Sequence, residues 1–137
     1  SDLFEFVRQY EPFSDNDYNF AGRPPLQADL LINTNDGKIP ISVINIHMKC
    51  CDSGLQRRKN AVNMLHDYVD GIFQTQSNII LLGDWNDDTK DEPGQHSFDS
   101  FFDDNRFHFV TEEISYDLSQ ASYPKEPWVS FLDLILV

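Results

Sequence analysis

Hydrophobic and polar positions alternate through the middle of the chain in the pattern of β-strands. Leu26–Asn33 and Ile39–Met48 are the clearest such runs, and Asn35-Asp36-Gly37 between them is a strong turn signal. We therefore predict a β-hairpin. In its second strand both sets of alternate side chains are apolar until the carboxyl end, where Asn45 and His47 share one face. Such a strand is expected at the centre of a sheet, covered on both sides.

A helical period follows the hairpin. Apolar residues recur at helical spacing at Val62, Leu65, Val69 and Ile72. This spacing predicts an amphipathic helix over residues 54–73, and Ser53 and Gln56 have the spacing of a capping box at its start. The polar residues expected mostly on its solvent side are Arg57, Arg58, Lys59 and Asp67.

The remaining segments complete the element order. They are a strand at Asn78–Asp84, a short helix at Ser97–Phe102, a strand at Phe107–Ile114, a proline-broken loop at Ser122–Trp128 and a final strand at Phe131–Val137. The first twenty residues show no clear period and are expected to be loop with one short strand. Strands and helices in this order predict an α/β or α+β protein with a mixed sheet.

The composition describes one globular domain, or part of one, over residues 1–137. No apolar run approaches the roughly 20 residues that cross a bilayer, and we expect a soluble protein without a targeting peptide. The compartment is left open, with a secreted or periplasmic location as one option. The formal net charge of −13 disfavours binding to nucleic-acid backbones through a basic surface, but a bound divalent cation reverses the local field.

The two cysteines, Cys50 and Cys51, are neighbours in the chain. Adjacent residues rarely reach the geometry of a disulfide bond. Two interpretations stay open: reduced residues that pack in the protein, or one partner of a bridge to another chain.

Polar residues collect at the ends of three apolar strands: Asn45 and His47, then Asp84 and Asn86, then Asp133. A polar group buried alone is costly, so each must be paired or must face a site. Taken singly, each has a structural interpretation. His47 can be a hydrogen-bonded structural histidine, Asp84-Trp85-Asn86 an Asx turn, and Asp133 a buried residue bonded to backbone amides. Their order along the chain favours a shared site.

In this order the segments resemble the endonuclease/exonuclease/phosphatase superfamily, which includes deoxyribonuclease I-like and exonuclease III-like nucleases. The matching segments are Asn45–Met48, Arg57 or Arg58 in the following helix, Ile79–Asp87 with its Gly-Asp-x-Asn element, Arg23-Pro24-Pro25, and Ser130–Leu136. The resemblance covers about residues 20–137. It implies an α/β fold in which the chain forms a portion of a two-layer, deoxyribonuclease I-like β-sandwich flanked by helices, as a single domain or the C-terminal part of one.

The resemblance also implies a phosphoester hydrolase that uses Mg²⁺ or Mn²⁺. Asp84 would orient or deprotonate the attacking water, and it is the candidate metal ligand. Asn86 and His47 would donate hydrogen bonds to phosphoryl oxygens. The other candidates are Arg23 as a phosphate clamp, Asn45 as a second substrate-binding residue and Asp133 as a catalytic residue.

Two family features have no counterpart. The family's metal-binding Glu lies upstream of the Arg-x-Pro stretch, where Glu5 and Glu11 stand in a different context. The terminal Ser-Asp-His element is absent, and Leu134 follows Asp133 where relatives have His, Tyr or Arg. We favour a partial domain whose missing strands were lost or come from another chain.

Two alternatives and the substrate stay open. The main alternative is a catalytically silent member that acts as a binding module, and a weaker one is a calcium-binding surface at Asp87–Glu92. The substrate could be a nucleic acid, a lipid or a small molecule, and the net charge favours a small or lipid-like phosphoester over duplex DNA. Three histidines match no family position and are expected to be structural or at the surface: His66, His96 and His108.

Overall fold

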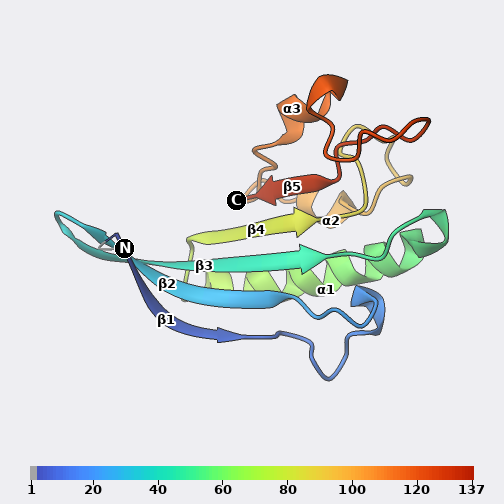
Figure 1. The fold of residues 1–137 in the computed structure, drawn as a ribbon. Helices are drawn as coiled ribbons and strands as arrows, with labels where there is room; N and C mark the ends of the chain where they lie inside the picture. The colour runs from blue at the N-terminus through green and yellow to red at the C-terminus, as the bar shows by residue number, and fades with distance from the viewer. Residues whose placement is uncertain (1–2) are drawn as a thin grey trace.

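The computed structural model describes residues 3–137 as one mixed sheet with a long helix on one face (Figure 1). The strands are β1 (Phe4–Tyr10), β2 (Leu26–Thr34), β3 (Gly37–His47), β4 (Ile79–Asp84) and β5 (Asp133–Leu136). They lie side by side in chain order, with β3 and β4 parallel and the other neighbours antiparallel. The prediction of an α/β protein with a mixed sheet is confirmed.

The predicted hairpin is β2 and β3, joined by the turn at Asn35-Asp36. The short strand expected among the first twenty residues is β1, which pairs with β2 along the edge of the sheet. A register shift between Phe6 and Arg8 interrupts the regular alternation of side chains between the two faces of β1. Phe6 therefore lies on the same face as its partner Leu30, whereas Arg8 shares the opposite face with Asp29.

The helix α1 (Leu55–Phe73) follows a short 3₁₀ turn, η2 (Asp52–Gly54). The predicted capping box is wrong, because Ser53 lies inside that turn and no side chain caps the helix. Gln56 instead donates to the side chain of Asn60, one turn further along the helix. The solvent position expected for Arg58 is also wrong, because its side chain is buried.

The core lies between α1 and the sheet. The buried face of the helix packs on the sheet side chains that alternate toward it. The fully or almost fully buried residues of this layer are Ile44, Ile46, Ala61, Val62, Leu65, Val69 and Leu81. A second group surrounds Trp85, whose ring contacts Phe98, Phe101 and Phe109 edge-on. Trp85 thus anchors the loop after β4 in the core.

The predicted strand at Phe107–Ile114 is wrong in its extent. Phe109 forms one isolated bridge with Leu136, and Val110 donates to the carbonyl of Ile135. At the next position the Thr111 side chain accepts from the Ile135 N–H and replaces a backbone acceptor. The chain then turns into α3 (Glu112–Ser115) and η3 (Leu118–Gln120). The other short elements are η1 (Tyr18–Phe20) and α2 (Asp99–Phe102), which lies within the predicted Ser97–Phe102 helix.

The face of the sheet opposite α1 is apolar and partly open to solvent. Within residues 3–137 no helix covers this face of β1, β2 and β3 (Figure 1). Its paired side chains on β2 and β3, all half-buried or exposed, are Leu26, Ala28, Leu30, Ile32, Ile39, Ile41 and Val43. A contiguous apolar surface of this kind is typical of an interface with another layer.

In residues 3–137 no helix is both long enough and apolar enough to cross a membrane.

Candidate active site at one edge of the sheet

Three of the predicted site residues form a row across neighbouring strands. His47 pairs with Asp84 in the β3–β4 register, and Asp84 pairs with Asp133 in the β4–β5 register. Paired residues share a face, so all three side chains lie on the face away from α1. The Nε2 atom of His47 lies 3.4 Å from Oδ2 of Asp84. Asn45, two residues before His47, belongs to the same face.

The turn after β4 fixes the direction of Asp84. Its Oδ1 accepts the backbone N–H of Asn86 at 2.9 Å, which makes the predicted Asx turn. Asn86 has a φ of 51°, a left-handed conformation that Asn tolerates better than most residues. Between them Trp85 is fully buried and donates from Nε1 to the Leu134 carbonyl at 3.2 Å. The turn is therefore both hydrogen-bonded and held by the core.

Gly83 allows β4 to approach β3 closely at this edge. It has a φ of 131°, and a Cβ atom there would lie 2.1 Å from the Ile46 carbonyl oxygen and 2.8 Å from Oδ1 of Asn45. Any other residue would have to displace backbone. The Gly of the Gly-Asp-x-Asn element thus brings the Asn45 amide oxygen next to the strand that carries Asp84.

One carbonyl oxygen joins two further site residues. The Met48 carbonyl, directly after β3, accepts from Nη2 of Arg23 at 2.8 Å and from Nδ2 of Asn86 at 3.1 Å. Arg23 precedes β2, and Asn86 follows β4. The shared acceptor therefore places a guanidinium and an amide, from segments far apart in the chain, beside the row of His47 and Asp84.

A buried ion pair lies under these residues. Nε and Nη2 of Arg58 bond to the two carboxylate oxygens of Asp87 at 3.0 and 3.2 Å, and both residues are about 95% buried. Nη1 of Arg58 also donates to the carbonyls of Lys49 and Cys51, at 2.9 Å each. The pair ties the loop after β3 to the loop after β4, and these two loops directly follow His47 and Asp84.

Sequence reasoning did not assign this role to Arg58. The signal was present, because Arg58, Val62, Leu65 and Val69 form one continuous helical stripe. A charged residue on an otherwise apolar stripe is buried only when it is paired.

These residues border a cleft with a volume of about 1230 Å³. Four of the six predicted site residues line it: Arg23, His47, Asp84 and Asn86. Asn45 and Asp133 do not line the cleft, although both belong to the same face of the sheet. Further lining side chains that the sequence did not indicate are Lys49, Leu55, Tyr123, Trp128 and Leu132.

The burial and the charges around the cleft shift the pKa of Asp84. Burial raises the pKa of Asp84 above its ordinary value, and the Asp133 carboxylate acts in the same direction. The Asn86 N–H, His47 and Arg23 oppose this shift without cancelling it. A partly buried carboxylate with a raised pKa is a better proton acceptor than an exposed one.

Several other expectations for this region need correction. Asp133 is exposed rather than buried. Cys50 and Cys51 are exposed and free, so they are not packing residues. The calcium-binding surface does not hold, because Asp87 and Asp88 are buried and paired with Arg58 and Lys90.

The remaining histidines agree with a structural or surface position. His96 is buried and accepts the Phe98 N–H, His66 contacts Asp104 at 3.0 Å, and His108 is exposed.

The oxygen donors of the row fit a hard cation that keeps most of its water. Within residues 3–137 no three His, Cys, Asp or Glu side chains are placed to enclose a metal ion. Mg²⁺, however, is commonly bound through one or two carboxylates, with water and substrate oxygens completing its shell. Asp84 and Asp133 are such a pair, directly opposite each other on β4 and β5. The donor set therefore fits Mg²⁺ or Mn²⁺ and does not fit a closed protein cage.

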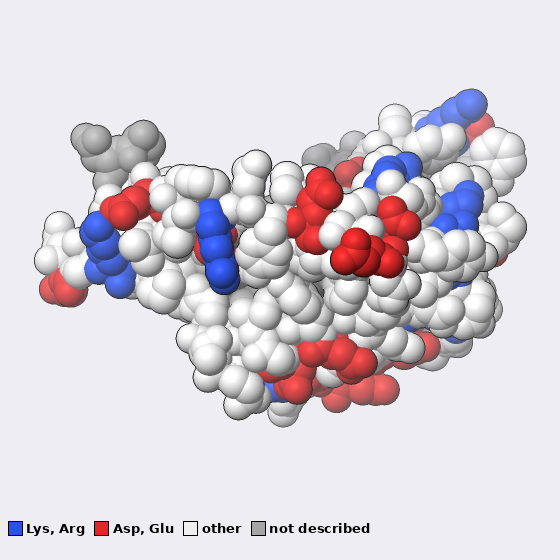
Figure 2. All heavy atoms as spheres, turned by 90° about the horizontal axis from the view of Figure 1, so that it is seen from below, with Lys and Arg blue, Asp and Glu red and all other residues white. Residues whose placement is uncertain are grey.

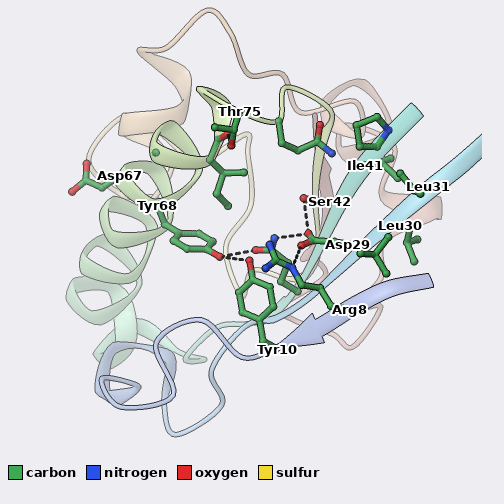
Figure 3. Close-up of a pocket in the computed structure, with 16 residues that line it drawn as sticks. Arg8, Tyr10, Asp29, Leu30, Leu31, Ile41, Ser42, Asp67, Tyr68 and Thr75 are labelled. Carbon is green, nitrogen blue, oxygen red and sulfur yellow. Dashed lines mark hydrogen bonds and ion pairs between the residues drawn. The ribbon is translucent and has the colours of Figure 1, made fainter. Parts of the chain in front are cut away.

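A second pocket, of about 670 Å³, is lined by residues of β1, β2 and β3 and by the last turns of α1 (Figure 3). A chain of hydrogen bonds crosses it. Tyr10 donates to Tyr68 at 2.9 Å, Tyr68 donates to Gln27 at 2.8 Å, and Gln27 donates to Asp29 at 2.7 Å. Ser42 donates to the same carboxylate oxygen of Asp29 at 2.7 Å, and Arg8 donates to the other at 2.6 Å. These groups satisfy one another, which is the arrangement of a structural network.

Acidic side chains form groups on the face of the molecule shown in Figure 2, and the basic ones stand apart from each other. Among the described residues this face has no continuous basic patch. This agrees with the net charge of −13.

No protein-family model matches the sequence, and no curated protein matches it. Solved structures do match, and the fold is that of endonuclease/exonuclease/phosphatase proteins. An endonuclease/exonuclease/phosphatase family protein from Bacteroides thetaiotaomicron matches with a TM-score of 0.63 and 15% identity, over 99% of this chain and 52% of that chain.

Two further structures carry more specific names. D. rerio TDP2, complexed with a single-strand DNA product, has a TM-score of 0.62 and 16% identity, over 98% of this chain and 53% of that one. The Bacteroides thetaiotaomicron mannosyl-6-phosphatase has a TM-score of 0.62 and 14% identity, over 99% and 53%. The chain spans about half the length of these structures. The predicted resemblance and the deoxyribonuclease I-like fold class are confirmed at the level of the fold.

Proposed function

We propose that the protein is a phosphoester hydrolase and that the edge of the sheet after β3 and β4 carries part of its active site. The observation that carries the proposal is the row of His47, Asp84 and Asp133, with Arg23 and Asn86 held beside it by one carbonyl. Phosphoester hydrolysis needs an oriented water, donors for the non-bridging oxygens and stabilisation of the developing charge. This edge supplies a group for each.

In the proposed mechanism Asp84 orients the attacking water and accepts its proton. Its raised pKa and its single backbone hydrogen bond leave carboxylate lone pairs available for this task. Asn86 donates from its side-chain amide to a phosphoryl oxygen, and His47 donates a ring N–H to another. Arg23 adds a guanidinium that can meet phosphate oxygens two at a time.

Asp84 and Asp133 would hold Mg²⁺ or Mn²⁺, which would supply Lewis acidity and neutralise negative charge on the phosphoryl group. Asn45 is the second substrate-binding candidate, and its amide oxygen lies beside Gly83. Leu134, which replaces the His, Tyr or Arg of relatives, is buried on the opposite face from Asp133. That substitution therefore leaves the row itself unchanged.

The geometry favours an enzyme over a catalytically silent binding module. A module that had lost its activity would be free to separate these side chains or to turn them away from each other. Here Arg23, His47, Asp84 and Asn86 all border one cleft. A buried ion pair and an anchored tryptophan also hold the two loops that carry the cleft.

The substrate proposed is a small or single-stranded phosphoester rather than duplex DNA. The acidic net charge of the chain opposes a broad contact with a duplex backbone, and so do the scattered basic side chains on the face shown in Figure 2. Two proteins of the same fold support these two kinds of substrate. One is named as a mannosyl-6-phosphatase, and the other was solved with a single-strand DNA product.

In the active form a further layer of the protein must pack on the open face of the sheet. This face is apolar, and the matching structures are about twice as long as this chain. We propose that the second sheet of a two-layer domain packs here and completes the cleft. The fluorescence of a hydrophobic dye tests this part: the 137-residue polypeptide should enhance it strongly and the full-length protein should not.

A metal-dependent activity panel tests the proposed function. The full-length protein is assayed on bis-p-nitrophenyl phosphate, single-stranded and plasmid DNA, and sphingomyelin, with Mg²⁺, Mn²⁺ or a chelator. Asp84→Asn is compared with Asp36→Asn, the same change in the exposed turn between β2 and β3. We expect metal-dependent activity that only Asp84→Asn removes. Activity that survives Asp84→Asn would refute the assignment, and inactivity on every substrate would favour the binding module.

A further inference from the structure

Cys50 and Cys51 lie on the wall of the cleft but have no part in the proposed hydrolysis. They follow β3 directly, both are exposed, and both line the cleft with Lys49. Within residues 3–137 both cysteines are free thiols, and neither forms a disulfide bond. Two exposed thiols in sequence are a reactive pair, unlike a single buried cysteine.

The backbone holds the two thiols together. Their sulfur atoms lie 2.7 Å apart, with the Cys51 thiol directed at the sulfur of Cys50. Cys51 has a φ of 70°, a left-handed conformation that is uncommon for a residue with a Cβ atom. The segment keeps this conformation because buried Arg58 donates to the carbonyls of Lys49 and Cys51, and Asp87 holds Arg58 in turn. The pairing of the thiols is therefore fixed by the fold.

The surroundings activate one thiol more than the other. The Cys51 thiol and the Lys49 ammonium, 3.7 Å from the sulfur of Cys50, both stabilise a Cys50 thiolate. They lower the pKa of Cys50, whereas the interaction with Cys50 raises that of Cys51. Cys50 is thus the attacking group and Cys51 the resolving group.

We propose that Cys50 and Cys51 form a thiol–disulfide exchange site that small-molecule disulfides oxidise to an intrachain disulfide. The Cys50 thiolate attacks one sulfur of the small disulfide, whose S–S bond breaks and releases a first thiolate. Cys51 then loses its proton and attacks the sulfur of Cys50, which expels the second thiolate. The two cysteines lose two electrons and two protons, and the small disulfide becomes two thiols.

The bond should also be easy to reverse. Adjacent Cα atoms lie about 3.8 Å apart, closer than the 4.4 Å or more found in most disulfides. A disulfide closed over such a short span is strained, and strained disulfides are readily reduced. The site therefore suits a bond that forms and opens with the thiol balance of its surroundings. This inference concerns the thiols alone and stands whether or not the cleft hydrolyses phosphoesters.

Mass spectrometry of the full-length protein tests the inference. The native protein is incubated with glutathione disulfide, quenched with acid, and weighed intact and as peptides. We expect the peptide that contains Cys50 and Cys51 to lose two hydrogen atoms without a lasting glutathione adduct, and dithiothreitol to restore them. Lasting adducts, disulfide-linked dimers or no reaction would each overturn the proposal.

Three variants separate the roles of the groups. Cys51→Ser should stop at a stable single glutathione adduct on Cys50, because the resolving thiol is gone. Cys50→Ser should react about tenfold more slowly, and Lys49→Gln several-fold more slowly, because the thiolate fraction falls. The wild-type protein in urea provides a comparison that does not depend on the folding of any variant. Equal rates for the folded and unfolded chains would show that the fold contributes nothing.

Discussion

Two aspartates on the same sheet respond to burial in opposite ways. Burial acts to raise the pKa of Asp29, but hydrogen bonds from Gln27, Arg8 and Ser42 outweigh it and leave that pKa below its ordinary value. Asp84 accepts one backbone N–H, and burial prevails, so its pKa is raised. Both carboxylates sit on β-strands beside a pocket. They differ in how many of their lone pairs the protein itself occupies.

The difference separates a structural network from a candidate site. Around Asp29 the donors come from the protein, and a ligand would have to break existing hydrogen bonds to bind. Beside Asp84 the imidazole ring of His47 lies 3.4 Å away, and the carboxylate borders the cleft with lone pairs that no side chain of the protein fills. A carboxylate left incompletely bonded in this way costs stability and is suited to bind water, metal or substrate.

The largest effect on stability is expected from Arg58, which is fully paired like Asp29 but lies under the site. Arg58→Met leaves Asp87 buried and uncompensated, and should lower the free energy of unfolding by about 3–5 kcal/mol. Urea denaturation measures the loss, with Lys59→Met, the neighbouring and more exposed position, as control. Adding Asp87→Leu should restore much of the stability, because no unpaired charge then remains buried. A small loss in the single variant would show that the pair does not hold the two loops.

A loss of about 2–3 kcal/mol is expected for Asp29→Leu at neutral pH, because Gln27 and Ser42 lose their shared acceptor. The folded-state pKa of Asp29 lies below its ordinary value of 3.8, so its contribution is present above that pH and disappears as the pH falls through the folded-state pKa. Urea denaturation should therefore show a gap between wild type and variant that narrows below about pH 4. A gap that stays constant with pH would contradict the network.

A smaller loss, of about 1 kcal/mol, is expected for Tyr68→Phe, which removes the hydroxyl between Tyr10 and Gln27. The double variant with Tyr10→Phe should lose less than the sum of the two single variants, because the hydroxyls bond to each other. Thermal denaturation of all four proteins completes this cycle. Additive losses of stability would mean that the two hydroxyls act independently. The hydrolase activity should be unchanged in all three variants.

The smallest effect on stability, and one of opposite sign, is expected for Asp84→Asn. The raised pKa of Asp84 means that its charged form is less favourable in the folded than in the unfolded chain, so the wild type loses stability as the pH rises through that pKa. The variant lacks this loss and should be slightly more stable at neutral pH. Its activity should fall by about 10²–10⁴-fold. A marked loss of stability would place Asp84 with Asp29 as a structural residue.

Much of the fold could be predicted because local patterns and tertiary packing agree in the central segments. The hairpin, the helix after it and the strand ending in Asp84 all keep one period along their length. Prediction failed where a single side chain replaced a backbone partner, as Thr111 does beside β5, and where Ser53 fell within a 3₁₀ turn. Neither the side-chain acceptor at Thr111 nor the 3₁₀ turn at Ser53 changes the pattern of apolar residues, so that pattern could not predict them.

The candidate site was predicted by a different kind of signal. Polar residues at the ends of apolar strands pointed to His47, Asp84 and Asp133, and the sheet register brings them into one row. The shared acceptor at Met48 and the burial of Arg58 depend on contacts between distant segments, which a single sequence does not reveal. The roles of the six residues stay predictions until the variants are assayed.

The crossover from β3 through α1 to the parallel strand β4 has a consequence for how the protein is made. Every member of the row gains its neighbours only from a strand distant in the chain, and closing such long loops costs entropy before any contact forms. During synthesis the hairpin and the helix can form as soon as they leave the ribosome. The cleft cannot, because it has no second wall until β4 and β5 have also emerged and docked.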